Sequence, residues 1–161
     1  MDIGPFQLGE PIGQGSMATV WAGVHRALGT PVAVKVLAGD VRSSPRFAAW
    51  FRTEVQAVAT LDHPGVIRVF DCGEVAESEE GASLGRLRAG SPWLAMELAG
   101  GGTLESITRP PPWEQLVGWL RILLEALAHA HAHGVVHRDI KPANILLSRP
   151  RDPRPGIKLA D

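Results

Sequence analysis

His137-Arg138-Asp139-Ile140-Lys141-Pro142-Ala143-Asn144 is the stretch from which the rest of the chain is best interpreted. It brings a carboxylate, an ammonium and a carboxamide close together, at positions 139, 141 and 144. Apolar runs flank it on both sides, at 135–136 and 145–147. Pro142 fixes its own φ and restricts the residue before it, so this segment has few backbone conformations. The pattern predicts a rigid loop at the edge of a core, with three different polar groups beside one another.

The composition is typical of a soluble globular protein. The chain has 161 residues, 45% of them hydrophobic and 20% charged, enough for one ordinary core or two small lobes. Its net charge of -1 gives no basic footprint for nucleic acid and no polybasic membrane signal. The single Cys72 excludes an internal disulfide and fits a reducing compartment. No secretory signal or membrane-spanning run occurs, so we expect a cytoplasmic location, which is compatible with an anchor elsewhere in a longer parent protein.

A glycine-rich segment near the N-terminus lies between two predicted strands. Residues 6–12 form the first strand, and Gly13-Gln14-Gly15-Ser16-Met17-Ala18 follows. The same glycine spacing occurs in dinucleotide-binding turns, but those turns open a helix. Here residues 19–24 are rich in β-branched and aromatic side chains, which favours a second strand. We therefore predict a hairpin whose glycines let backbone amides approach an anion, with an ordinary hairpin turn as the alternative.

Residues 31–37 are strongly β-forming and place a lysine among apolar neighbours. A lysine on an inner face of a sheet costs free energy unless an anion meets it. The residues alone leave two interpretations open, an anion-binding lysine and an edge lysine whose ammonium reaches water. The alternation of a strand puts Val32, Val34 and Val36 on one face, and Ala33, Lys35 and Leu37 on the other.

A helix is predicted over residues 44–61, with a serine cap and a proline in the first turn. Glu54 lies on its apolar stripe and therefore needs a partner, for which Lys35 is the available inward cation. The alternative is a solvated helix glutamate. The stripe itself consists of Phe47, Phe51, Val55 and Val58.

The segments that follow complete the first half of the chain. Residues 66–70 and 93–98 are predicted strands, and 99–102 a flexible crossing. Residues 73–92 show little periodicity and change from acidic to basic. We predict a long surface loop there, favouring a solvated insertion over a docking segment.

The second half is predicted to be mainly helical before the loop at 137–144. A short helix at 103–107 precedes a long one at 113–133. His129 and His133 have the spacing of two helical metal ligands, but no acidic residue accompanies them, so imidazoles near the negative end of the helix dipole are the simpler account. Residues 145–147 and 157–160 are predicted to pair as strands. The apolar face of the long helix consists of Leu116, Leu120, Leu123, Leu124 and Leu127.

Taken in order, these motifs resemble the protein kinase family. Asp139 and Asn144 match the H-R-D-x-x-x-x-N loop, residues 32–35 match V-A-I-K, and the glycine segment matches the nucleotide lid, with Ala18 at the place of its third glycine. Lys141 resembles the serine/threonine class, and the lid and loop are most similar to bacterial members. The resemblance implies an α+β, two-lobe, protein-kinase-like fold. Its N-lobe, residues 1–98, would hold a five-stranded antiparallel sheet and one helix, and residues 99–161 would supply the hinge and part of the helical C-lobe.

The resemblance also implies ATP and Mg²⁺ as cofactors and a role for each motif residue. Lys35, held by Glu54, would pair with the α- and β-phosphates. Asp139 would accept the proton of a substrate hydroxyl, and Lys141 would steady the transferred phosphoryl group. Asn144 and Asp161 would hold Mg²⁺. The implied ATP-binding residues are Ile12, Gly13, Gln14, Gly15, Val20, Ala33, Lys35, Met96, Glu97, Ala99 and Leu146.

The expected activity is transfer of the ATP γ-phosphate to serine or threonine hydroxyls of a protein substrate. Asp161 stands at the first position of the metal-binding D-F-G, so we expect residues 1–161 by themselves to be inactive and the activity to belong to the parent protein. Two alternatives remain open: a nucleotide-binding pseudokinase acting as a regulatory module, favoured by Ala18, and a small-molecule phosphotransferase of related fold. No nucleic-acid partner or membrane contact is expected from this segment.

Overall fold

The computed structural model describes residues 1–15, 17–38 and 45–160, with the backbone alone for residues 45–50. The chain forms two compact units. Unit 1 comprises Met1–Gln56 and Val69–Leu98, and unit 2 comprises Ala57–Arg68 and Ala99–Asp161. Residues 57–68, which the sequence analysis assigned to the N-terminal lobe, therefore cluster with unit 2. The chain passes between the units after residues 56, 68 and 98.

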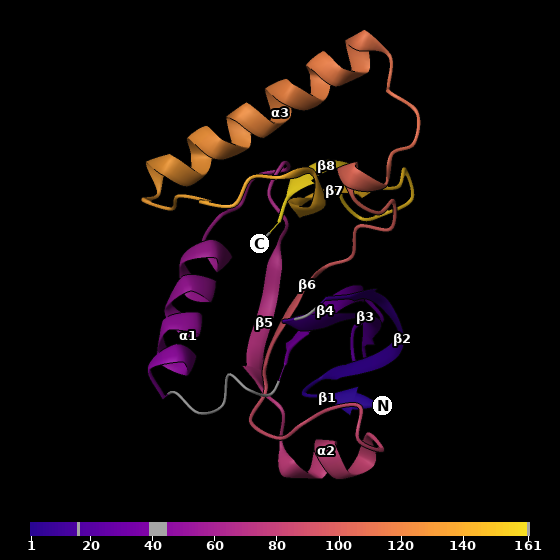
Figure 1. Cartoon of the computed structure of the whole chain (residues 1–161), viewed down its shortest axis with the longest axis vertical. Coiled ribbons are helices and arrows are strands. Elements are labelled where there is room, and N and C mark those ends of the chain that lie inside the picture. Colours follow the sequence, from indigo (N-terminus) through magenta and orange to yellow (C-terminus); the bar gives the residue numbers. More distant parts are fainter. Residues whose placement is uncertain (16, 39–44, 161) are drawn as a thin grey trace. The chain divides into compact units, whose positions relative to one another are not determined.

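Unit 1 is built on an antiparallel sheet (Figure 1). Within the described residues its six strands lie in the order β1-β2-β3-β4-β6-β5. The predicted antiparallel sheet is confirmed, and the five expected strands are joined by β1, which pairs with β2 and is too short for a periodic signal. The elements up to residue 97 are β1 (Asp2–Ile3), β2 (Phe6–Gln14), β3 (Ala18–His25), β4 (Pro31–Leu37), α1 (Pro45–Ala59), β5 (Val69–Glu74), α2 (Glu77–Ala82) and β6 (Pro92–Glu97), and the last three residues of α1 belong to unit 2.

The glycine-rich segment connects two antiparallel strands and opens no helix. Gly13 pairs with Val20 across the β2–β3 hairpin, and the Gly15 N–H donates to the Ala18 carbonyl at 2.9 Å. The register shifts on both sides of Pro11, which has no N–H to give to the ladder. This hairpin excludes the dinucleotide-binding turn, because that turn requires a helix after the glycines.

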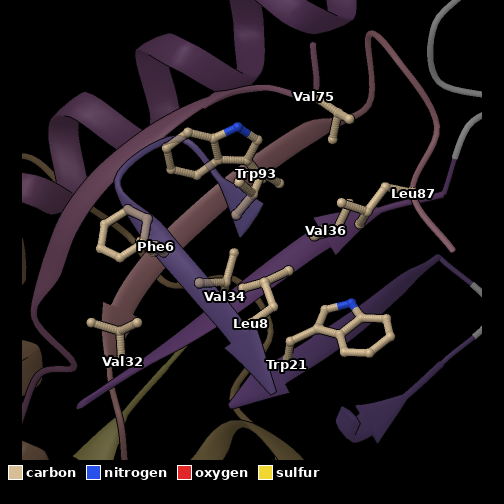
Figure 2. Packing of buried hydrophobic residues seen from close by; sticks show 11 residues of the cluster. Phe6, Leu8, Trp21, Val32, Val34, Val36, Val75, Leu87 and Trp93 are labelled. Carbon is tan, nitrogen blue, oxygen red and sulfur yellow. The ribbon is translucent and has the colours of Figure 1, made fainter. Parts of the chain in front are cut away.

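The core of unit 1 lies on one face of its sheet, and Figure 2 shows the packing. Side chains from β4 alternate as predicted, with Val32, Val34 and Val36 all buried in this core. The Phe6 and Trp93 rings meet edge to face at a centroid distance of 5.8 Å. One face of the sheet therefore carries this core, and the side chains of the intervening β4 residues point to the other face.

Residues 73–92 do not form the predicted solvated loop. They contain the end of β5, helix α2 and the start of β6, and Leu87 is buried at 1% exposure. The Glu79 carboxylate accepts from the Gly4 and Ala76 N–H groups, both at 2.7 Å, so α2 is fixed beside β1. The segment has no periodic signal because single contacts, rather than a regular apolar stripe, attach it to the core.

The predicted strand at 66–70 is also wrong in its bounds. Strand β5 begins at Val69, whereas Val66 forms an isolated parallel bridge with Leu159 of unit 2. The Ile67 N–H donates to the Leu159 carbonyl at 2.8 Å. The apolar run 66–70 is thus divided between two units, and β5 continues into the more polar residues that follow because β6 offers them backbone partners.

Unit 2 packs one long helix against a short hairpin. Its elements are 3₁₀ turns at Leu104–Ser106 and Pro142–Asn144, helix α3 (Trp113–Ala132), and strands β7 (Ile145–Ser148) and β8 (Gly156–Leu159). The predicted long helix is confirmed, and Gly134 follows it with φ +75°, a conformation typical of a helix C-terminus. The described residues contain no helix long and apolar enough to cross a membrane.

The leucine face of α3 is only partly covered. Leu123 is buried with Ala126 and Ala130 against apolar residues of β7 and β8, whereas Leu120 and Leu124 are exposed. The close approach of Gly65 to the helix explains this choice, since a Cβ there would lie 2.8 Å from Ile122. The buried stripe therefore follows the small residues of the helix rather than all of its leucines.

Candidate active site

Four of the predicted nucleotide-binding residues of unit 1 lie on one face of the sheet. Val20 pairs with Lys35, and Ala33 pairs with Met96, so these side chains share the face opposite the core described above. Lys35 is half-buried there, while Ala33 and Met96 are buried. Val20, Ala33 and Met96 give this face apolar side chains, and Lys35 adds the one charge of this set.

The remaining predicted residues of unit 1 lie at the ends of strands. Ile12, Gly13, Gln14 and Gly15 are exposed along the β2 end of the hairpin, where backbone N–H groups can meet an anion. Glu97 ends β6 and is buried, at 3% exposure.

Glu54 does not occupy the inward position that its sequence stripe suggested. It is exposed on α1, and none of the ion pairs between described residues joins it to Lys35. On the same helix, Arg52 forms an ion pair with Glu74 of β5 at 2.6 Å, and Val55 is buried. The Lys35–Glu54 pair therefore stays a prediction.

In unit 2, the loop at 137–144 brings its three polar groups together. The Lys141 Nζ donates to the Asp139 Oδ2 at 2.7 Å. The Asn144 Nδ2 donates both to the same Oδ2 and to the Asp139 backbone carbonyl, each at 2.9 Å. Asn144 is buried at 7% exposure, whereas the Asp139 side chain is 60% exposed. One exposed carboxylate is thus oriented by a cation and by an amide that is itself fixed in the core.

The backbone around this carboxylate is held from both sides. Arg138 has φ 61°, a left-handed conformation that costs a non-glycine residue about 1–2 kcal/mol. The His137 Nε2 lies 3.1 Å from the Ala160 carbonyl oxygen, and the Ala160 N–H donates to the Asn144 carbonyl at 2.9 Å. These contacts join the loop to the end of β8 and keep Arg138 in its strained conformation. Asp161, the predicted second metal ligand, lies outside the described residues.

The contacts within this loop act on the charge of Asp139. The hydrogen bond from Lys141 is the largest cause and lowers the pKa of the Asp139 carboxyl below its ordinary value of 3.8. Desolvation opposes it, and the hydrogen bond from Asn144 adds a further, smaller lowering. Because the folded pKa lies below the unfolded one, the ionised form stabilises the fold above pH 4 or so, and this contribution is lost as the pH falls through the folded pKa.

Replacing Lys141 with methionine is expected to raise the pKa of Asp139, since the largest cause of its lowering is then removed. The measurement is a titration of the Asp139 carboxyl carbon by NMR in the wild-type chain and in Lys141→Met. An Arg121→Met variant on the exposed face of α3 serves as the control for a general change in charge. Equal midpoints in wild type and Lys141→Met would show that the ammonium does not act on this carboxylate.

The remaining predicted residues of unit 2 lie where the chain enters it and on β7. Ala99 begins the crossing that leads from β6, and Leu146 pairs with Lys158 and forms an isolated bridge with Thr103. Asp152 was not among the predicted residues, although its carboxylate accepts the Gly100 N–H at 2.8 Å. Its surroundings, a run of prolines and arginines, indicate only a turn.

Three comparisons bear on the family. Residues 6–161 match the protein kinase domain. The chain is 38% identical over 161 residues to the serine/threonine-protein kinase PknA of Mycobacterium tuberculosis, covering 98% of this chain and 35% of PknA. It is 37% identical over 146 residues to the serine/threonine-protein kinase PknB of Mycobacterium leprae, covering 89% of this chain and 22% of PknB.

Solved structures agree with the sequence matches. The crystal structure of the Mycobacterium tuberculosis PknI kinase domain resembles the chain with a TM-score of 0.76 at 25% identity, covering 100% of this chain and 60% of that one. The chain therefore spans only part of the length of these relatives. The family match extends over the glycine hairpin, the Lys35 strand and the Asp139 loop, and the chain belongs to the protein kinase family.

Proposed function

We propose that the protein containing this chain transfers the γ-phosphate of ATP to serine or threonine hydroxyls of other proteins. The observation that supports this most directly is the Asp139 carboxylate, ionised and oriented by Lys141 and Asn144. A carboxylate held in this way can accept a proton from a hydroxyl, and the ammonium beside it can attract a phosphoryl group. The relatives named above, PknA and PknB, are serine/threonine-protein kinases.

The donor groups of the chain fit ATP and Mg²⁺. Lys35 offers a cation beside the apolar surface of Val20, Ala33 and Met96, as a base and its phosphates require. The Asn144 amide donates both of its bonds to Asp139 through its nitrogen, so its carbonyl oxygen can face a hard cation. Asn144 and Asp161 would hold Mg²⁺, which when bound neutralises charge on the phosphates.

The roles of the chain's own residues follow from their chemistry. The exposed glycines of the hairpin would cover the phosphates through backbone N–H groups, and Lys35 would bind two of those phosphates. Backbone groups of Glu97 and Ala99 would hydrogen-bond the adenine, with Met96 and Leu146 beside it. Asp139 would orient the attacking hydroxyl and take its proton, while Lys141 would stabilise charge on the transferred group.

The activity is tested with the protein as its gene encodes it. Incubation with labelled ATP, Mg²⁺ and a mixture of peptides should yield phosphoserine or phosphothreonine. Label on an aminoglycoside and not on peptides would instead support a small-molecule phosphotransferase. Nucleotide binding with no transfer to any acceptor would support a regulatory pseudokinase.

Nucleotide binding by the chain itself is expected to depend on Lys35. Replacing Lys35 with alanine removes charge-assisted hydrogen bonds to phosphate, each worth about 1.5–3 kcal/mol, so the affinity for a fluorescent ATP analogue should fall at least about tenfold. The matched control is Arg88→Ala, which removes an exposed cation of the same unit. Equal affinities for wild type and Lys35→Ala would exclude the lysine as a phosphate ligand.

A further inference from the structure

We infer that the loop between β7 and β8, residues 149–155, is a clamp that fixes both segments of unit 2 from which the chain passes into unit 1. These segments are 57–68 and the start of 99–161. The loop reaches the first through Arg154 and the second through Asp152. Asp152 is therefore a positioning residue for the crossing, and its effect on nucleotide binding rests on the function proposed above.

The Asp152 carboxylate closes the loop and holds the crossing at once. Its Oδ2 accepts the Arg149 N–H at 2.7 Å within the loop and the Gly100 N–H at 2.8 Å from the crossing. The contact with the crossing is close, because a Cβ added at Gly100 would lie 3.3 Å from the Asp152 Oδ1. Hydrogen bonds to an ionised acceptor are about twice as strong as neutral ones, so this bond should hold the crossing more strongly than a neutral backbone bond would.

The backbone of the crossing is fixed to β7 beside this carboxylate. The Gly101 N–H donates to the Leu147 carbonyl at 2.7 Å, and the Leu147 N–H donates to the Gly102 carbonyl at 2.8 Å. A Cβ at Gly101 would lie 2.6 Å from the Leu147 carbonyl oxygen, so only glycine permits the approach. The crossing is thus attached to a strand at 101–102 and to a carboxylate at 100, directly after Ala99.

Arg154 attaches the other end of the same loop to the segment before β5. Its guanidinium donates to the His63 carbonyl at 2.8 Å, and its side chain is 24% exposed. The nearby Asp62 carboxylate, at 3.8 Å and 75% exposed, adds only a weak ion pair. His63 is itself in a tight turn, since its Nδ1 accepts the Gly65 N–H and its carbonyl accepts the Val66 N–H.

The backbone of the loop is restricted, so the contact at Gly100 and the contact at His63 are held at a fixed spacing. Prolines at 150, 153 and 155 restrict its backbone, and Asp152 ties it to Arg149. If the crossing were displaced, the backbone groups of Ala99 would no longer be positioned to hydrogen-bond the adenine. The apparent affinity for nucleotide would then fall with the fraction of molecules in which the crossing is in place.

The test compares Asp152→Ala with a control from the same loop, Arg151→Ala, which removes an exposed side chain. Hydrogen exchange resolved by residue in the 161-residue chain needs no nucleotide. Asp152→Ala should speed exchange at Gly100 and Gly101 by about tenfold or more, since a charge-assisted bond is lost. Arg154→Ala should speed exchange at Gly65 and Val66 instead, and Arg151→Ala should change neither pair.

A second measurement is the affinity for a fluorescent ATP analogue. Asp152→Ala should weaken it about fivefold, and Asp152→Asn, which keeps an acceptor oxygen, should stay within about twofold of wild type. If Asp152 had only a structural role, Asp152→Ala would lower the melting temperature, and Asp152→Asn would not restore the affinity for nucleotide. If Asp152→Ala fails to fold, Gly100→Ala replaces it, because its Cβ must displace the same carboxylate.

Unchanged exchange at Gly100 and Gly101 in a folded Asp152→Ala or Gly100→Ala variant would overturn the clamp. Faster exchange with nucleotide affinity equal to wild type would overturn the positioning role of Asp152. A wild-type chain that binds no nucleotide would count against the proposed function, while the exchange measurement would still decide for or against the clamp.

Discussion

Asp139→Asn, made in the protein as its gene encodes it, is expected to slow phosphotransfer by about 10²–10⁴-fold, the usual effect of losing a positioned general base. Asparagine has the same shape and can still accept the hydrogen bond that Lys141 gives to Oδ2. It has no carboxylate to accept a proton, however, and no negative charge to balance the ammonium. Initial rates with labelled ATP at saturating nucleotide measure the loss.

The same variant should be nearly as stable as wild type. The Asp139–Lys141 pair is largely exposed, and such solvent-screened pairs contribute little to folding. Asp71→Asn is the matched control, since Asp71 is an exposed aspartate whose carboxylate caps the N–H of Cys72. Near-normal turnover by a folded Asp139→Asn protein would remove this residue from the chemistry.

Elements whose signal is local could be predicted from the sequence. Strand β4 is observed at the predicted bounds, 31–37, because its β-branched alternation matches a sheet with one buried face. Helix α3 ends within a residue of its prediction, since a glycine in a left-handed conformation follows it. The Asp139 loop came together for a similar reason, because a short spacing and one proline leave few conformations.

Elements that depend on distant partners could not be predicted. The Glu79 carboxylate that fixes α2 bonds to Gly4, 75 residues away in the sequence. Glu54 shows the same difficulty at the candidate site, because its place on an apolar stripe did not decide which way α1 turns it. Asp152 lies in a turn whose partner, Gly100, is 52 residues away. For Glu79 and Asp152, a single polar contact between remote segments leaves no periodic trace in the sequence.

Trp93→Ala is expected to lower the free energy of unfolding by about 3–5 kcal/mol, the range for truncating a large aromatic side chain in a core. Trp93 is 5% exposed and packs against Phe6 (Figure 2). Glycines on two sides make room for the indole: a Cβ at Gly73 would lie 2.7 Å from its ring, and one at Gly4 would lie 3.1 Å away. Glycines have no side chains to fill the space left by the mutation, so the cavity should persist.

The matched control is Trp113→Ala at the start of α3, because Trp113 is 73% exposed. Its effect should stay within about 0.5 kcal/mol, as for surface substitutions in general. Urea unfolding followed by circular dichroism gives both free energies, and an unchanged slope against denaturant shows that the same surface is exposed in each variant. A loss of stability at position 93 no greater than at position 113 would mean that the glycine-bounded indole site is not a packed core.

Trp93 lies on the sheet face opposite Lys35. The folded fraction of Trp93→Ala should therefore bind nucleotide with unchanged affinity, which separates the role of this core from that of the binding face.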